Sequence, residues 1–264
     1  MEKNSRELVV LLPAYNEEGN VERMLERWEA ESQCIEQHGL VLRIVAVNDG
    51  SSDRTHDLCR ILEEKYENFT LVEHEHNKGL GEAVKTGFRY VLEHCPDAAY
   101  ACLMDCDNTQ DPANIGRMLD RILQTEDPAD VVIASRYQEG SEVYGVAKHR
   151  LFTSGGARLV YETLLGVKNV RDYTCGYRLY SRKSLELLQK GFGDQMIEES
   201  GFTCMAEVLY KMNLCGVRFT EVPFTLHYDF KEGESKMKVL KTAVNSLKLT
   251  FRLRRLKPRQ ESMV

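Results

Sequence analysis

The chain has 264 residues, of which 42% are hydrophobic and 29% are charged, with a formal net charge of −6. This length and composition are ordinary for a folded protein with one large domain or two small ones, and they exclude an intrinsically disordered chain. Eight cysteines are scattered without a CxxC pair or a zinc-like spacing, which excludes a disulfide scaffold and indicates a reducing, cytoplasmic compartment.

The apolar runs of the sequence are all too short for a membrane-spanning helix, which needs about 20 residues. The stretch Leu8–Leu12 is also too short for a signal peptide. We therefore expect a cytoplasmic protein that associates peripherally with the inner face of the membrane.

The first half of the chain alternates strand-like and helix-like patterns. Short apolar runs predict five strands, at Leu8–Leu12, Val41–Val47, Phe69–Val72, Tyr100–Met104 and Asp130–Ser135. Helical patterns begin near Gly19, after a cap at Ser52 or Asp53, at Gly81 and at Pro112. The expected inward faces are Val21, Met24, Leu25 and Trp28 in the first helix, and Leu58, Ile61 and Leu62 in the second. This alternation predicts an α/β fold, with a mostly parallel sheet and helices on both faces.

Polar clusters follow three of these strands. Ala14–Glu17 follows the first strand, Asn48–Asp53 follows the second, and Asp105–Asp107 follows the fourth. Ligands of such sheets bind at the carboxyl ends of the strands, so the three clusters predict one shared site.

Asp105 and Asp107 give the sharpest chemical signal. Residues i and i+2 of an extended segment point to the same side, so both carboxylates can face one hard cation such as Mg²⁺ or Mn²⁺. A cation there would stabilise a departing diphosphate. A solvated turn at the end of a strand is the alternative interpretation of the same pair.

Other polar groups suit a phosphorylated ligand. Asp49 can accept hydrogen bonds from a nucleobase, and the glycine-rich loop Asn77–Gly81, with Lys78, can cradle phosphate or sugar. Three arginines suit bidentate phosphate binding: Arg136, Arg150 and Arg178. A single arginine is nevertheless more often a surface residue or an ion-pair partner.

The C-terminal segment is basic and amphipathic. From Lys236 to Arg259 there are nine basic residues and no acidic one. An apolar helix stripe with spacings of three and four residues consists of Met237, Leu240, Val244, Leu247 and Phe251. Such a helix either lies on an anionic membrane surface or packs on the domain with its charges in solvent. We divide the chain into a main domain at 1–235 and a basic amphipathic helix and tail at 236–264.

Seven motifs, taken in order, resemble the family 2 glycosyltransferases with a GT-A fold, and most of all the polyprenol-phosphate (dolichol-phosphate) mannose synthases. The resemblance runs from about Leu8 to Leu240. Its motifs are Leu12–Glu17, Asn48–Thr55, Asn77–Gly81, Met104–Pro112, Ala134–Tyr137, Asp172–Tyr180 and Gly233–Lys236. Asn48 stands where such proteins often carry a second Asp, and Asn108 and Cys106 vary the surroundings of the aspartate pair.

The resemblance implies a role for each matching residue. It implies that Pro13, Tyr15, Glu17 and Asp49 hold the nucleoside. It implies that Asp105 and Asp107 hold Mg²⁺ or Mn²⁺ and the donor diphosphate, with help from Thr109 or Gln110. Arg136 and Arg150 would bind donor or acceptor phosphate, and Ser235 and Lys236 would belong to a loop that closes on the site.

The activity implied is an inverting transfer of a hexose, with mannose from GDP-mannose favoured, to a polyprenyl phosphate at the cytoplasmic membrane face. One alternative is transfer of glucose or an N-acetylhexosamine to a lipid phosphate or a glycan hydroxyl, for which Glu198, Glu199 or Glu207 could act as base. The sequence also leaves open a non-catalytic nucleotide-sugar binding protein and a nucleotidyltransferase. Besides donor and acceptor, we expect the membrane surface or a membrane protein as partner, and no nucleic acid.

Overall fold

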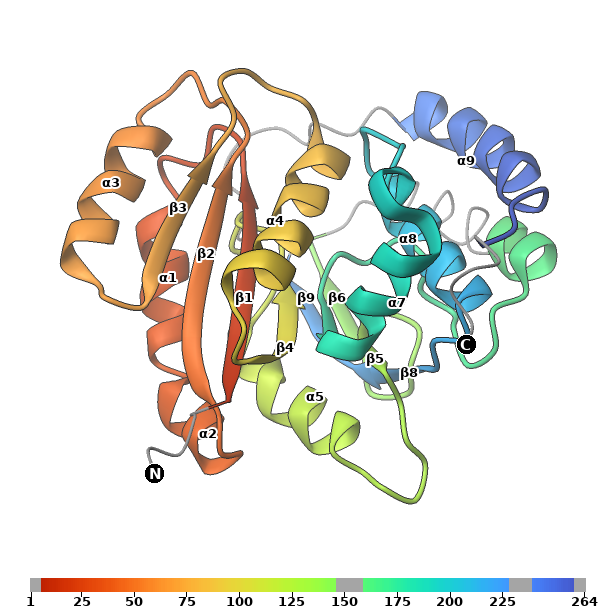
Figure 1. The fold of residues 1–264 in the computed structure, drawn as a ribbon, viewed down its shortest axis with the longest axis horizontal. Helices are drawn as coiled ribbons and strands as arrows, with labels where there is room; N and C mark the ends of the chain where they lie inside the picture. Colours follow the sequence, from red (N-terminus) through yellow and green to blue (C-terminus); the bar gives the residue numbers. More distant parts are fainter. Residues whose placement is uncertain (1–5, 146–158, 228–238, 259–264) are drawn as a thin grey trace.

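Seven strands form one sheet at the centre of the computed structural model, which describes residues 6–145, 159–227 and 239–258 (Figure 1). The strand order is β3-β2-β1-β4-β7-β5-β8. The bounds are β1 Glu7–Ala14, β2 Val41–Asn48, β3 Phe69–Glu73, β4 Ala98–Leu103, β5 Val131–Ser135, β7 Arg178–Ser181 and β8 Phe219–Pro223. Only β7 runs antiparallel to its neighbours among these described strands. The five predicted strands and the mostly parallel sheet are confirmed.

Helices cover both faces of this sheet, as predicted (Figure 1). On one face lie α1 Val21–Glu29, α2 Ser32–Gln37, α3 Thr55–Lys65 and α5 Ile115–Ile122, the last preceded by a 3₁₀ turn at Pro112–Asn114. On the other face lie α4 Leu80–His94, α7 Arg182–Phe192 and α8 Cys204–Leu214. A small second sheet pairs β6 Glu142–Tyr144 with β9 Thr225–His227 in parallel.

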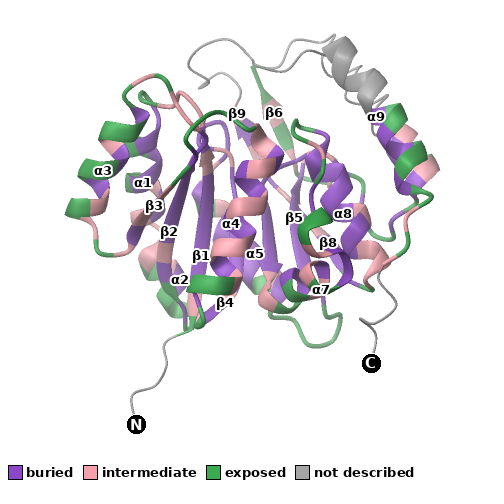
Figure 2. Cartoon of the chain, turned by 45° about the horizontal axis from the view of Figure 1, so that its top comes forward, coloured by how far each residue is buried: buried purple, intermediate pink, exposed green. Residues whose placement is uncertain are grey.

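The central strands are buried on both sides, which explains their unbroken apolar sequence. Every residue from Leu8 to Leu12 is buried between the helix layers (Figure 2). β1 pairs in parallel with β2 on one side and with β4 on the other. The order of the strands therefore reverses at β1 and β4, where sheets of this type bind their ligands.

The inward face of α1 is confirmed, but that of α3 is partly wrong. Ile61 is 55% exposed, and the buried residues of α3 are Thr55, Cys59 and Leu62. Positions 55, 59 and 62, at spacings of four and three residues, form the buried stripe of this helix, and Ile61 falls outside it. The start of α3 is held by Asp53, whose carboxylate accepts hydrogen bonds from the amide and the hydroxyl of Thr55.

The last described helix, α9 Val239–Leu253, packs against α8. Within the described residues, we find no helix with the length and apolar character that a membrane crossing requires. The predicted division of the chain at residues 235 and 236 lies outside the described residues and stays a prediction.

A buried ion pair joins α8 to its surroundings. Lys211 and Glu207 are both fully buried, with Nζ and Oε1 2.8 Å apart. The Glu207 carboxylate also accepts hydrogen bonds from the backbone amides of Glu198, at 3.0 Å, and Glu199, at 2.8 Å. Arg252 of α9 contacts the same carboxylate at 3.3 Å. One buried anion therefore holds together α8, α9 and the segment at 198–199.

Replacing Lys211 by alanine should expose the importance of this pair. The change leaves Glu207 buried without its main cation, and loss of one partner of a buried pair costs about 3–5 kcal/mol. We expect the lower end of that range, because Arg252 still contacts Glu207. The free energy of unfolding in urea measures the loss.

The matched control is Lys183→Ala, which removes an exposed lysine 3.9 Å from Asp130 and should cost less than about 1 kcal/mol. Equal losses in the two variants would contradict a special role for the buried pair.

Candidate active site

The loops after β1 and β2 are joined by hydrogen bonds. The amide of Asn16 donates to Ser51 Oγ at 2.9 Å, and the amide of Ser52 donates to Asn16 Oδ1 at 2.8 Å. Asn16 adopts a positive φ of 54°, a conformation that Asn tolerates better than most residues. The two predicted clusters are thus parts of one rigid rim, in which Pro13, Tyr15 and Glu17 are all half-buried.

Asp49 organises the next loop. It is buried, its Oδ1 lies 2.7 Å from His74 Nδ1, and it accepts hydrogen bonds from the amides of Lys78 at 2.9 Å and Gly79 at 2.8 Å. The glycine-rich loop therefore folds around this carboxylate, while the Lys78 side chain is exposed at the rim. A contact of Asp49 with a nucleoside stays a prediction.

Asp105 and Asp107 lie in the turn that follows β4. The Asp105 carboxylate accepts a hydrogen bond from Gln110 Nε2 at 2.9 Å, and that of Asp107 accepts one from Thr109 Oγ1 at 2.6 Å. Both aspartates are half-buried, whereas Thr109 and Gln110 are buried behind them. Thr109 and Gln110 thus orient the carboxylates, and a direct contact of Thr109 with metal stays a prediction.

Gly176 completes the wall beside Asp105. A Cβ at this position would lie 3.0 Å from Asp105 Oδ1, so a side chain there would press on the carboxylate. The turn is also tied to the small second sheet, because the amide of His227 donates to the carbonyl of Thr109 at 2.9 Å.

The two aspartates fit a hard divalent cation that completes its coordination elsewhere. Within residues 6–145, 159–227 and 239–258, no group of three His, Cys, Asp or Glu side chains forms a metal cage. Mg²⁺ and similar ions are often held by one or two carboxylates and take their other ligands from substrate phosphates and water. Burial raises the pKa of the intervening Cys106 thiol well above its ordinary value, and nearby carboxylates add to this. Cys106 is therefore a neutral thiol, and the pair offers oxygen ligands only.

Arg136 forms an ion pair that the sequence did not reveal. Its Nη2 lies 2.6 Å from Asp172 Oδ1, its Nε donates to Asp172 Oδ2 at 2.8 Å, and Thr174 Oγ1 accepts at 2.7 Å. Burial alone would raise the pKa of Asp172, but Arg136 holds it below its ordinary value. The guanidinium of Arg136 is thus largely engaged within the protein, and its predicted contact with phosphate stays a prediction.

The remaining predicted residues fall into two groups. Arg178 is buried, and its guanidinium donates to the carbonyls of Met205 and Tyr173, so it supports the wall of the site. Arg150, Ser235 and Lys236 lie outside the described residues, and their predicted roles stay predictions. Sequence reasoning missed His74, and it named Asp172 and Gly176 only as members of the motif Asp172–Tyr180, without a role for either. The motif itself was the available signal for these two residues.

The sequence profile of glycosyl transferase family 2 matches residues 9–188. The chain belongs to this family of glycosyltransferases. It is 30% identical over 245 residues to dolichol-phosphate mannosyltransferase from Pyrococcus furiosus, covering 92% of this chain and 62% of that protein. It is 31% identical over 232 residues to polyprenol monophosphomannose synthase from Mycolicibacterium smegmatis, covering 87% and 80%. Identity to dolichyl-phosphate beta-glucosyltransferase from Saccharomyces cerevisiae is 26% over 260 residues, covering 92% and 71%.

Solved structures share the fold. Glucosyl-3-phosphoglycerate synthase from Mycobacterium tuberculosis superposes with a TM-score of 0.63 at 17% identity, covering 94% of this glycosyltransferase and 81% of that chain. A mannosyltransferase from Pyrobaculum calidifontis, solved with GDP-Man and Mn²⁺, has a TM-score of 0.60 at 16% identity, covering 96% and 65%. At such identities the likeness shows the fold alone, and it agrees with the GT-A class expected from the motifs.

Asn108 allows a test of the turn that carries the aspartate pair. It is buried, its φ is 58°, and its Nδ2 donates to Asn20 Oδ1 at 2.9 Å. Asn108→Ala and Asn108→Gly both lose this hydrogen bond, but only alanine is strained at a positive φ. We expect the alanine variant to be less stable than the glycine variant by about 1 kcal/mol in urea unfolding. Equal stabilities would show that the left-handed turn imposes no constraint.

Proposed function

We propose that this family 2 glycosyltransferase moves a hexose from a nucleotide sugar to a polyprenyl phosphate, with inversion at the anomeric carbon. The observation that carries the proposal is the pair Asp105 and Asp107, oriented by Gln110 and Thr109 where the strand order reverses. The similarity to enzymes named for transfer to dolichol or polyprenol phosphate, over most of this chain, supports that acceptor class. Mannose from GDP-mannose is our first choice of donor, and glucose is the second because one relative is a glucosyltransferase.

Different residues of the site would bind different parts of the donor. Asp105 and Asp107 would hold Mg²⁺ or Mn²⁺, which would neutralise the donor diphosphate and stabilise it as a leaving group. Asp49 and the rim of Pro13, Tyr15 and Glu17 would hold the nucleoside, as the family resemblance implies. Arg136, Arg150, Ser235 and Lys236 remain our candidates for contacts with phosphate.

A phosphate acceptor agrees with the surroundings of Glu199 and Glu207, two of the glutamates considered as a base. A hydroxyl acceptor needs a base, whereas a lipid phosphate is already ionised near neutral pH. Glu207 is fully buried, and its two oxygens already serve Lys211, Arg252 and two backbone amides. Glu199 is paired with Arg252 at 2.9 Å. These engagements favour a phosphate over a hydroxyl as the acceptor.

A lipid acceptor would place this activity at a membrane. We propose that the protein works as a peripheral enzyme at the inner face of the membrane, either by its own basic C-terminal helix or together with a membrane protein. The nine basic residues between Lys236 and Arg259, with no acidic residue among them, support the first of these two arrangements.

A donor panel tests the function directly. We expect release of nucleoside diphosphate from GDP-mannose or a glucose donor only when Mg²⁺ or Mn²⁺ and a short-chain polyprenyl phosphate are both present. The measurement is coupled detection of the nucleoside diphosphate, together with mass analysis of the lipid. Donor binding without release on addition of the lipid phosphate would contradict the acceptor, and metal-independent release would contradict the role of the aspartates.

Asp107→Asn should lower the rate of transfer at least about a thousandfold, because the variant loses a charge at the developing diphosphate. Unfolding in urea should change little, since asparagine keeps an acceptor for Thr109. The matched control is Asp111→Asn, four residues further along the same turn, whose half-exposed side chain caps the 3₁₀ turn and pairs with Arg27. Similar transfer rates in the two variants would overturn the assignment of Asp107.

A further inference from the structure

The helix α9 has two different long faces. Ser246, Leu249, Thr250 and Leu253 are all buried, and their spacings of three and four residues form one stripe. This inner stripe lies on the buried side of α9, which packs against α8, and Arg252 pairs with Glu199. The apolar stripe that the sequence predicted is a different one, which includes Leu247 and Phe251.

The predicted stripe faces away from the domain where its side chains are described. Leu247 is 44% exposed and Phe251 is 61% exposed. At 100° per residue, both lie on the side of α9 opposite to Leu253 and Leu249. Met237, Leu240 and Val244 continue the same spacing in the sequence but lie outside the side chains that the structure describes. The two described members of the predicted stripe are thus exposed, and a different stripe of α9 contacts the domain.

Cations surround these exposed apolar residues. Lys248, Arg254, Arg255 and Lys257 are all exposed, and the sequence has no acidic residue between Lys236 and Arg259. We name Leu247, Lys248 and Phe251 of the helix, together with Arg254 and Arg255 in the turn directly after it, the outer face of α9. Its composition, with apolar side chains among lysine and arginine, is that of helices lying in the interface of an anionic bilayer.

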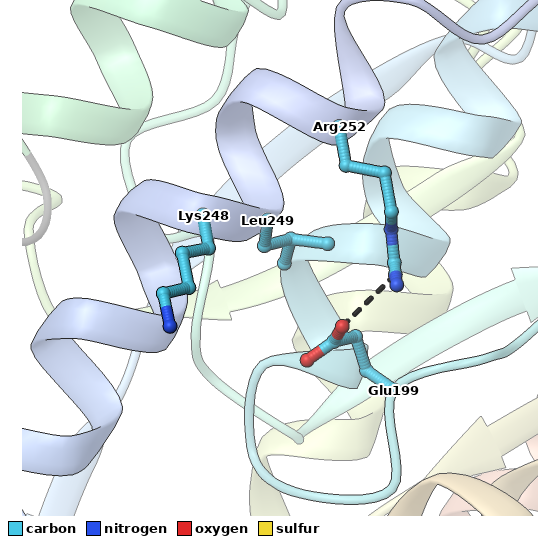
Figure 3. A pocket seen from close by; sticks show the side chains of 4 residues that line it. All are labelled: Glu199, Lys248, Leu249 and Arg252. Atoms are coloured by element: carbon cyan, nitrogen blue, oxygen red, sulfur yellow. Dashed lines mark ion pairs between the residues drawn. The ribbon is translucent and has the colours of Figure 1, made fainter.

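Arg252 belongs to the anchor of the helix and not to the outer face. Its Nη2 lies 2.9 Å from Glu199 Oε1 (Figure 3). The same atom lies 3.3 Å from Glu207 Oε1. Arg252 and Glu199 line a pocket of about 290 Å³ with Lys248 and Leu249, and Lys248 points away from Glu199 in this view (Figure 3). The charge of Arg252 is thus neutralised by the domain, while that of Lys248 has no carboxylate within this pocket left to pair with.

Two segments that contact α9 add further exposed apolar side chains. Phe202, 42% exposed, follows Glu199 in the same loop, and Leu159, 65% exposed, lies two residues before Tyr161, which is beside Ser246 of α9. Within the described residues, four of the eight exposed large hydrophobic side chains lie on α9 or on these segments. Exposed apolar side chains gathered on segments that contact one another are typical of an interaction surface.

We propose that the outer face of α9 binds an anionic lipid bilayer, with Phe251 and Leu247 among the lipid headgroups and Lys248, Arg254 and Arg255 on their phosphates. The exposed charges of this surface all have one sign, which suits the phosphates of an anionic bilayer better than the mixed charges of an ordinary protein surface. The proposal rests on the proposed function in one respect: a polyprenyl phosphate acceptor requires the enzyme to work at a membrane.

The docked orientation would place the donor site beside the bilayer. α9 lies towards the same side of the molecule as the carboxyl ends of β1, β2 and β3 (Figure 1). Arg252 contacts Glu199, and the neighbouring Ser200 carbonyl accepts a hydrogen bond from the amide of Gly81 at 3.1 Å. Through Glu199 and Ser200, α9 is therefore linked to the loop built around Asp49.

Vesicle binding of the full chain tests the proposal. The probes are vesicles of phosphatidylcholine alone and of phosphatidylcholine mixed with phosphatidylglycerol, in cosedimentation without nucleotide sugar or polyprenyl phosphate. We expect binding to the mixed vesicles that weakens as salt rises. Lys248→Gln/Arg254→Gln/Arg255→Gln should bind about a hundredfold more weakly, and Leu247→Ser/Phe251→Ser at least about tenfold more weakly. The matched control Ile61→Ser, at a similarly exposed position on α3, should bind like the wild type.

The outcomes separate this proposal from the proposed function. Wild-type binding by both α9 variants, or equal binding to neutral and anionic vesicles, would overturn the docking surface. So would self-association in sedimentation that the Leu247→Ser/Phe251→Ser variant abolishes, since the occupant would then be a second copy. Vesicle binding by a chain that transfers no sugar keeps the surface and removes the function. Sugar transfer by the wild type, together with wild-type vesicle binding by both α9 variants, keeps the function and removes the surface.

Discussion

Parallel pairing of β1 with β2 on one side and β4 on the other is the constraint on which the site depends. It requires strands that are apolar on both faces, which Leu8–Leu12 supplies, and it leaves the strand ends as the place for polar loops. Because the order reverses here, the loop after β1 meets the loop after β2 and also the aspartate turn after β4. A slip of the β1 register would separate all three.

Buried polar groups keep these loops in one arrangement, each by a saturated set of hydrogen bonds. Asp49 gathers the glycine loop, Asp172 holds Arg136, and Glu207 binds the segment at 198–199. A buried carboxylate left without partners is costly, so each of these anions opposes rearrangement of the backbone that surrounds it. Asp105 and Asp107, which we propose as metal ligands, differ from them because both are only half-buried.

The sequence predicted well what depends on local pattern. Five strands, the face of α1 and the aspartate pair all follow from short apolar runs and the residues at their ends. It could not predict β7 or the pairing of Arg136 with Asp172, because these contacts join segments that are far apart in the sequence. It could not predict the ion pair of Lys211 with Glu207 as buried, because burial depends on the packing around α8. The error at Ile61 arose because the apolar residues Leu58, Ile61 and Leu62 also fit one helical face, and only packing against the sheet decides which face is buried. For α9 the sequence contains two stripes, and only packing decides which of them meets the domain.

Gly81 has a consequence for attempts to exchange parts between relatives. A Cβ at this position would overlap the carbonyl oxygen of Glu199, and one at Gly79 would overlap that of Ser200. At these two glycines, the half of the chain that we propose to bind the donor packs backbone against backbone on the later half, with no side chain between them to absorb a misfit. A chimera that takes the loop Asn77–Gly81 from another glycosyltransferase must therefore also take residues 198–200 from it. Either segment alone would face a backbone whose shape it does not fit.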